Sequence, residues 1–317
     1  MITRIRSRFG PEMVAVVLLI LAFGFSAFRE PRFLDAEYLF DRSTLYMEAG
    51  ILALSMTFVI IAGHIDLSVT SILALVGAIC TTLVSKYGLP PAAMIIIAPV
   101  VGGALGALNG LLVSKGKLPS LVVTLATMAL FRGVAQILLG DHSLPMPKEL
   151  VGIHKIQLPG TYFHVPMVLL AVLAVVAAGV LHRTVWGRWV TALGTNAEAA
   201  RHAGIPTGKI LIQLFTLSGV AAGIGSMLML SRLGVARFDH ARGLELDVIT
   251  AVVLGGASIF GGRGTIFGTI TALGLVGVVQ TGMGVAGVKA EVQVAVIGLL
   301  LIVSVLFSNF TARKRGR

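Results

Sequence analysis

Apolar residues form long runs over most of the chain, and polar residues gather in short segments between these runs. A helix of about 20 apolar residues is long enough to cross the hydrocarbon core of a bilayer. The pattern therefore predicts an all-α, polytopic membrane protein with about ten transmembrane helices. The predicted spans are residues 11–28, 45–62, 68–85, 92–113, 121–139, 165–181, 210–230, 244–260, 265–283 and 288–307.

The spans divide equally between the two halves of the chain. Five spans in each half make the halves cross the membrane in opposite directions, so we expect two inverted halves, a plan common among transporters. No linker or low-complexity segment separates two domains. We therefore expect a single transmembrane domain over residues 1–317.

One apolar stretch is too long for a single span. Residues 45–85 would form a helix about twice as long as a bilayer core is thick. The chain must therefore turn or break near residues 63–66, and Asp66 or Ser68 is expected to cap the next helix. Whether residues 63–66 form a turn outside the membrane or a break within it is open.

A polar segment at about residues 183–209 interrupts the apolar pattern. Asn196 is a good N-cap, and Glu198 follows in the first turn, where the helix dipole favours a negative charge. Gly204 suits the left-handed position after a helix, and Pro206 prevents continuation. The pattern predicts a short helix outside the bilayer, and from these residues alone an ordinary solvated loop is an equal alternative.

Composition supports a membrane protein: 56% of residues are apolar and 12% are charged, against about 25% charged in soluble domains. The single cysteine, Cys80, excludes a disulfide within the chain. The net charge is +11, and most of the 25 Lys and Arg residues fall in the two tails and the segments predicted on the same side. The positive-inside rule then places both termini and the segment 183–209 in the cytoplasm, with lipid rather than nucleic acid as the partner of the basic residues.

Three motifs carry a resemblance to a known family. The segment 187–205 contains Ala-Leu-Gly-Thr-Asn at 192–196 and Glu-Ala-Ala-Arg at 198–201, and it resembles the cytoplasmic coupling loop of bacterial ABC importer permeases. Gly-His-Ile-Asp-Leu-Ser-Val at 63–69 and the glycine-rich run at 254–265 resemble two further motifs of the branch that carries ribose, xylose, rhamnose and autoinducer-2. His64 and Thr70 depart from the family pattern, which has glycine more often at both positions.

The resemblance implies the partners and the place of the protein. It implies a permease subunit in the bacterial inner membrane, a cytoplasmic ABC ATPase, a periplasmic sugar-binding protein, and a second permease copy or paralogue. The short helix would dock into a groove on the ATPase, and the small side chains of Ala199 and Ala200 would allow a close approach. The residues implied in this contact are Gly194, Asn196, Glu198, Ala199, Ala200, Arg201, Gly204 and Ile205.

Charged residues at membrane depth are costly and are therefore candidate functional residues. Arg132 lies inside a predicted span and is expected to pair with a carboxylate or with carbonyls, unless it reaches the interface. Glu245 and Asp247 mark the predicted outer end of the span 244–260 and are candidates to face a binding protein, unless they are a solvated helix start. The candidates for the pathway or its gate are Asp66, Ser68, Arg132, Asn109, Phe58 and Phe131.

No motif for catalysis is found in the sequence. The glycine-rich run at 256–263 has arginine where a phosphate-binding loop needs lysine. We expect no catalytic residue, no metal and no cofactor, with ATP bound by the partner subunit. The sequence leaves open two alternatives, an ion-coupled secondary transporter and a membrane receptor or scaffold, and it does not name the sugar.

Overall fold

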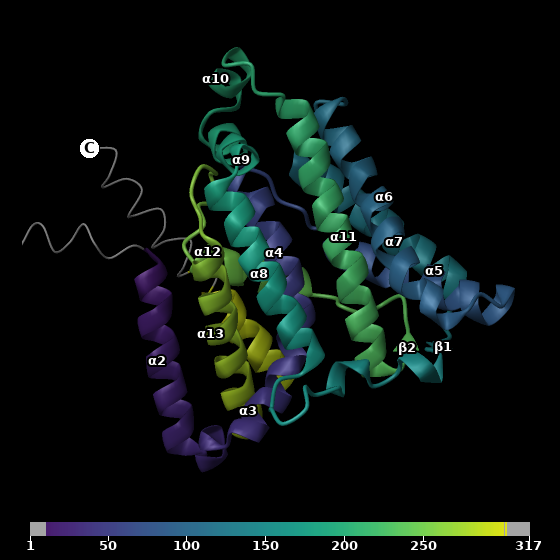
Figure 1. The fold of residues 1–317 in the computed structure, drawn as a ribbon, viewed down its shortest axis with the longest axis vertical. Coiled ribbons are helices and arrows are strands. Elements are labelled where there is room, and N and C mark those ends of the chain that lie inside the picture. The colour runs from purple at the N-terminus through teal and green to yellow at the C-terminus, as the bar shows by residue number, and fades with distance from the viewer. Residues whose placement is uncertain (1–10, 301, 303–317) are drawn as a thin grey trace, which may run out of the picture.

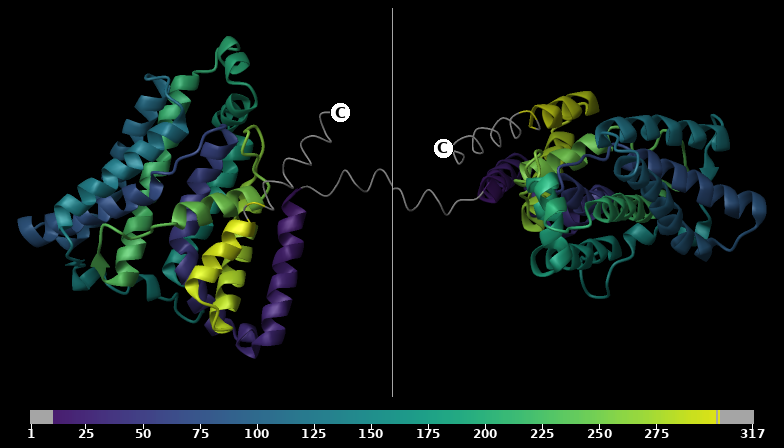
Figure 2. Two further views of the ribbon diagram at one scale, coloured as in Figure 1. Left: turned by 180° about the vertical axis from the view of Figure 1, so that it is seen from behind. Right: turned by 90° about the horizontal axis from the view of Figure 1, so that it is seen from above.

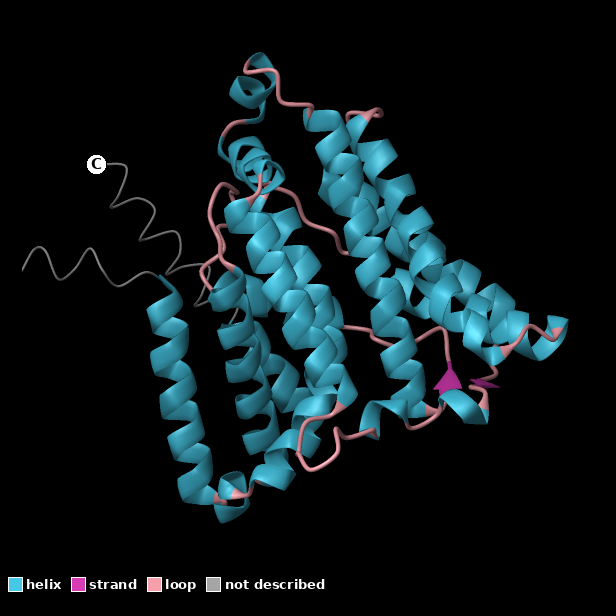
Figure 3. Cartoon of the chain, viewed as in Figure 1, coloured by secondary structure: helices cyan, strands magenta, loops and turns pink. Residues whose placement is uncertain are grey.

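The computed structural model describes residues 11–300 and 302, and this part of the chain is almost entirely helical (Figure 3). The strands in it are β1 (Leu144–Pro145) and β2 (Val235–Ala236), which pair in antiparallel register. Because helices satisfy their backbone hydrogen bonds internally, this architecture suits the apolar runs of the sequence.

Long helices make up the body of the molecule (Figure 1). They are α2 (Pro11–Arg29), α4 (Met47–Ile61), α5 (Val69–Tyr87), α6 (Met94–Ser114), α7 (Ser120–Leu139), α8 (Val165–Arg183), α11 (Thr207–Leu233), α12 (Leu244–Leu254) and α13 (Ile266–Val285). A further short apolar helix covers Ala290–Leu300. The connecting helices are α3 (Ala36–Ser43), α9 (Val185–Thr195), α10 (Ala197–His202) and the 3-10 turns η1 (Pro31–Leu34), η2 (Thr44–Tyr46), η3 (Pro91–Ala93), η4 (Lys148–Leu150) and η5 (Ile153–Lys155).

Seven helical segments among the described residues are long and apolar enough to cross a membrane, and shorter apolar helices lie at Met13–Arg29 and Ala290–Leu300. The polytopic all-α fold is therefore confirmed. One predicted span differs in length: α12 ends at Leu254, because residues 255–265 form a glycine-rich turn rather than the end of a helix. The basic tails at 4–8 and 313–317 lie outside the described residues.

Helix α4 is the centre of the bundle, and all of its residues are buried. Glu48 in its first turn accepts a hydrogen bond of 2.9 Å from Arg232 at the end of α11, which forms a largely buried ion pair. Helices α6 and α11 approach so closely that a Cβ added at Gly102 would overlap the carbonyl oxygen of Gly219. Small residues allow this backbone contact, as is usual between membrane helices.

The polar connections separate to two ends of the molecule. Helices α9 and α10 and the turn between α6 and α7 lie at the upper end in Figure 1, whereas α3, β1 and β2 lie at the lower end. Helix α2 lies along one edge beside α13, as both views in Figure 2 show. This arrangement puts the polar segment 183–209 on the same side as the basic turn at 115–117, as the charge pattern predicted.

Candidate functional site

The chain breaks between α4 and α5, where the sequence required it to. Helix α4 ends at Ile61, Gly63 adopts a positive φ of 80°, and α5 begins at Val69. The broken segment begins beside the end of α9 and runs inward to Asp66, which is fully buried. The segment is exposed at Gly63 and enters the bundle by Asp66, so it is not a turn that stays in solvent.

Asp66 is the centre of a buried polar cluster. Its Oδ1 accepts hydrogen bonds from the backbone nitrogen of Ser68 at 3.0 Å and from the Ser68 hydroxyl at 2.6 Å. Its Oδ2 accepts one from the Ser218 hydroxyl of α11 at 2.7 Å. The Asn109 amide of α6 donates to the Ser68 hydroxyl at 2.7 Å. Three elements thus contribute to the cluster, which includes three of the predicted pathway residues.

Asp66 does not cap α5 in the way that the sequence reading expected. An N-cap side chain accepts from a nitrogen in the first helical turn, but Asp66 accepts from Ser68, which precedes the helix. The Ser68 side chain makes no capping hydrogen bond. The carboxylate instead fixes the turn before α5 and joins it to α11.

Sequence reasoning did not single out Ser218. A serine in an apolar helix usually bonds to its own backbone, so nothing local marks Ser218 as a partner for Asp66. The Oδ1 atom of Asn109 is buried and has no hydrogen-bond partner in the described part of the chain. The cluster therefore holds one unused acceptor beside its donors.

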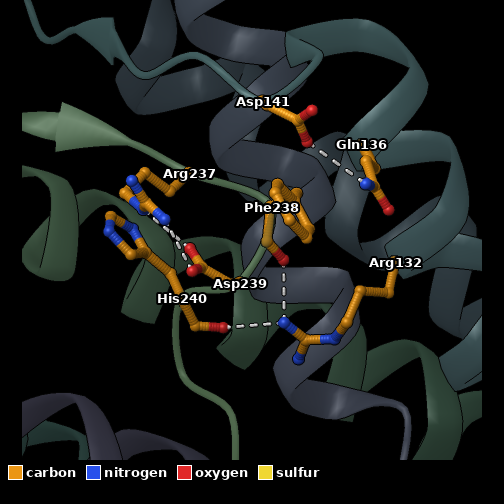
Figure 4. A network of polar contacts seen from close by, with 7 residues as sticks. All are labelled: Arg132, Gln136, Asp141, Arg237, Phe238, Asp239 and His240. Atoms are coloured by element: carbon orange, nitrogen blue, oxygen red, sulfur yellow. Dashed lines mark hydrogen bonds and ion pairs between the residues drawn. The ribbon is translucent and has the colours of Figure 1, made fainter.

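Arg132 of α7 fixes a second irregular segment, the connection between β2 and α12 (Figure 4). Its Nη1 donates to the carbonyl oxygens of Phe238 at 2.8 Å and His240 at 3.1 Å. The predicted pairing with carbonyls is confirmed. In the same segment, Arg237 donates two hydrogen bonds to the Asp239 carboxylate, of 2.8 Å from Nε and 2.7 Å from Nη2.

Glu245 and Asp247 lie in the first turn of α12. Figure 1 shows the connection from β2 crossing the bundle between the two ends of α11, so α12 begins within the bundle and not at an outer end. Glu245 accepts a hydrogen bond of 2.9 Å from Thr70 at the start of α5, and Asp247 accepts one of 3.4 Å from Gln280 of α13. Contact of these carboxylates with a binding protein stays a prediction.

Phe58 and Phe131, the aromatic candidates for the pathway, are not members of the polar cluster around Asp66. Phe58 of α4 packs on Trp186 of α9, with ring centroids 5.5 Å apart. Phe131 is buried in α7. Neither ring takes part in the hydrogen bonds of Asp66 and its partners. A role for the two residues in the pathway stays a prediction.

Helix α10 has the punctuation that the sequence predicted. The Asn196 side chain accepts from the Ala199 nitrogen at 2.9 Å, and Gly204 takes a positive φ of 80° after the helix. Glu198, Ala199 and Arg201 are exposed. The helix lies at the upper end of the molecule, away from the long helices (Figure 1). An exposed, well-capped helix at one end of a membrane bundle is a suitable contact for another protein.

Two features of this loop differ from the sequence reading. Ala200 is buried by the chain's own residues, so Ala199, but not Ala200, offers a small side chain to a partner. The eleven residues before Asn196 form α9, which the sequence reading did not predict. Helix α9 is held by the N-cap of Thr184 and by a hydrogen bond of 2.8 Å from Trp186 to Gln213 of α11.

Comparisons with known proteins agree with this geometry. Residues 38–305 match the family described as the permease component of the branched-chain amino acid transport system. The chain is 35% identical to the autoinducer 2 import system permease protein LsrD of Photorhabdus laumondii, over 95% of the chain and 92% of that protein. It is 34% identical to the LsrD protein of Escherichia coli strain K12, with the same coverage of both proteins.

No solved structure matches the chain. The family match covers most of the sequence, and the similarity to the LsrD proteins extends over nearly all of it. The matching region contains the broken segment with Asp66, the segment with α9 and α10, and the glycine-rich turn before α13. The chain therefore belongs to the family of permease subunits of ABC-type sugar and autoinducer-2 importers, as a multi-pass protein of the inner membrane.

Proposed function

We propose that this permease carries a monosaccharide or a related small, hydroxyl-rich solute across the bacterial inner membrane, driven by a separate ATPase. The observation that carries the proposal is the buried polar cluster of Asp66, Ser68, Asn109 and Ser218 at the break between α4 and α5. Broken helices at membrane depth are typical of transporter substrate sites. Hydroxyl, amide and carboxylate groups are the partners that a hydroxylated solute needs when it leaves water.

The cluster is closed in this structure, since its members are fully buried and bond to one another. We infer that it acts as a gate. When the helices separate, the donors that Asp66 holds, together with the free Oδ1 of Asn109, become available to the solute. Names of the relatives support a solute of this class, because the LsrD proteins are named as permeases for autoinducer 2 import.

The proposed partners follow from the two ends of the molecule. Helix α10 would dock on a cytoplasmic ABC ATPase, and a periplasmic binding protein would deliver the solute to the opposite end, where α3 and the segment 140–164 lie. A second permease copy or paralogue would complete the pathway. In this orientation both termini are cytoplasmic.

The test is reconstitution of the permease in proteoliposomes with the ATPase and binding protein of the same importer. We expect uptake of labelled ribose, rhamnose or autoinducer-2 that requires ATP, and ATP hydrolysis that rises when the loaded binding protein is added. Uptake driven by a sodium or proton gradient without ATP would support a secondary transporter instead. Uptake under neither condition, with any of the three solutes, would contradict the proposed solute class.

A further inference from the structure

Three segments far apart in the sequence meet at the end of α4. They are the last residue of α4, Ile61, the end of α9 at residues 194–195, and the turn before α13 at residues 261–264, and we call this meeting point the glycine junction. The nitrogen of Gly262 donates a hydrogen bond of 2.8 Å to the carbonyl oxygen of Ile61. Backbone therefore contacts backbone where the three segments meet.

The junction has no room for side chains. A Cβ added at Gly194 would overlap the carbonyl oxygen of Ile61. A Cβ at Gly261 would stand 2.6 Å from the Gly194 carbonyl oxygen, and one at Gly262 would stand 2.7 Å from the Thr195 hydroxyl. At Gly194 and Gly261 the nearest atoms all belong to the backbone, so no side-chain rotation relieves these two clashes. At Gly262 the nearest atom is the Thr195 hydroxyl, and the Thr195 Cα at 3.2 Å is the next limit.

Each segment leads directly to a part of the proposed transport machinery. Residues 194–195 are followed at once by Asn196, the N-cap of α10. Ile61 is followed, within five residues, by Asp66 of the buried cluster. Residue 264 precedes Thr265, the N-cap of α13, and a buried bond of 2.8 Å between the hydroxyls of Thr57 and Thr269 joins α13 back to α4.

From this geometry we propose that the glycine junction is the rigid connection that transmits movement of α10 to the gate at Asp66. A close-packed backbone contact cannot absorb a displacement, so the ends of α4, α9 and the 261–264 turn move together. Gly194 is then a positioning residue. The family resemblance implied that it takes part in the ATPase contact, but its Cβ position faces Ile61 and Gly262 within the chain, so we assign it the role of keeping α9 against Ile61. This inference rests on the proposed function.

The first test replaces Gly194 with Ala. Alanine favours a helix more than glycine does, so any loss must come from the overlap with Ile61 and not from the stability of α9. We expect solute uptake to fall by at least about tenfold while the ATPase still co-purifies and hydrolyses ATP, so that fewer solute molecules are carried for each ATP. The matched control is Gly179→Ala in α8, where a Cβ meets no atom within 4 Å.

Wild-type uptake in Gly194→Ala would overturn the proposal. So would an equal loss of uptake and ATP hydrolysis, because a purely structural role lowers both in proportion. If the ATPase no longer co-purifies with wild-type permease, the proposed function itself fails, and this outcome is distinct from a failure of the junction. If Gly194→Ala does not insert into the membrane, the second test decides whether the glycine junction is rigid.

The second test locks the junction with a disulfide. A Cβ at Gly262 would lie 3.4 Å from the Thr195 Cβ, close to the separation of about 3.5–4.5 Å in disulfides. In the double variant Thr195→Cys/Gly262→Cys, with Cys80→Ala, uptake is compared before and after oxidation of the same sample. The reduced sample controls for the strain of a side chain at Gly262, whose φ is 77°.

A rigid junction predicts that the oxidised and reduced samples transport equally, because the bond joins parts that never separate. A loss of uptake on oxidation that a reductant restores would show that the junction opens during transport and would overturn the proposal. Failure of the two cysteines to cross-link would overturn the geometry on which it rests. The single variants Thr195→Cys and Gly262→Cys, which form no such bond, control for oxidation elsewhere.

Discussion

At the scale of single residues, the buried charge of Asp66 is balanced by hydrogen bonds. Burying a carboxylate is costly unless it is paired or hydrogen-bonded. Asp66 accepts from three donors, one of them on α11, and Arg132 similarly finds two carbonyl oxygens in the connection to α12. Both charged residues therefore hold irregular backbone to a neighbouring helix.

We predict that Asp66→Ala destabilises the protein more than Asp66→Asn does. Alanine removes the acceptor of all three donors, and the Ser68 backbone nitrogen, which cannot rotate to another partner, is left unsatisfied at a cost of about 1–3 kcal/mol. The Asn oxygen keeps an acceptor for Ser68, and the Ser218 hydroxyl can rotate to accept from the Asn amide. Thermal unfolding in detergent and solute uptake measure the two effects. Glu291→Ala, which removes an exposed carboxylate outside α3 and the segment 140–164, is the control.

The solute uptake of Asp66→Asn shows whether transport needs the hydrogen bonds of Asp66 or its negative charge. We expect Asn to retain much of the uptake, since hydrogen bonding is the role that the structure assigns. If Asn is as inactive as Ala, the negative charge is required, and an ion-coupled transporter becomes the better account.

At the scale of elements, two contacts at opposite ends of the bundle set how its helices can move. Helix α10 presents Ala199 outward and keeps Ala200 inside its own loop. At the other end, the ion pair between Glu48 and Arg232 joins the first turn of α4 to the last turn of α11. A partner that moves α10 therefore acts at one end of the bundle, while the ion pair keeps α4 and α11 together at the other end.

We predict that Ala199→Trp leaves the permease inserted and stable but prevents binding of the ATPase. Exposed substitutions usually change stability by no more than about 0.5 kcal/mol, so a large effect must come from the partner. Co-purification with the ATPase is the measurement, and Ala126→Trp on exposed α7 surface is the control. Normal ATPase binding by Ala199→Trp would exclude this face of α10 as the contact.

For the ion pair, we predict that Arg232→Met costs about 3–5 kcal/mol because it leaves the Glu48 charge buried without its partner. The double variant Glu48→Gln/Arg232→Met should recover much of this loss, since no uncompensated charge remains. Thermal unfolding of the two variants in detergent measures the difference. If the single and double variants are equally stable, solvent already stabilises the Glu48 carboxylate that Arg232→Met leaves unpaired, and the predicted cost of burying that charge is wrong.

At the scale of the whole molecule, the polar segments divide between two ends, and the proposed mechanism needs those ends on opposite sides of the membrane. Helix α10 is at one end, and the segment 140–164 is at the other (Figure 1). The charge pattern places α10 in the cytoplasm. The orientation can be measured directly.

We predict that a single cysteine at Thr161 reacts with an impermeant thiol reagent from outside intact cells. A cysteine at Glu198 should react only after the membrane is opened. Both residues are exposed, and both variants are made with Cys80→Ala, although Cys80 is itself buried. Labelling of Glu198 and protection of Thr161 in intact cells would reverse the topology and remove α10 from the ATPase.

The sequence by itself determined the features that depend on neighbouring residues. Apolar runs set the helices, the excess length of residues 45–85 required the break near Asp66, and Asn196 and Gly204 delimited α10. Each of these follows from interactions within a few residues, such as a cap, a backbone conformation or the length of a span. Such interactions leave a local pattern in the sequence.

Only the tertiary structure decided what these elements touch. Ser218 is 152 residues from Asp66, and Gly194 and Gly262 meet Ile61 from two later parts of the chain. The burial of Ala200 and the partners of Arg132 likewise depend on how the helices pack. Packing is a property of complementary surfaces far apart in sequence, and no single segment encodes it, which is why the gate cluster and the glycine junction become visible only when the chain is folded.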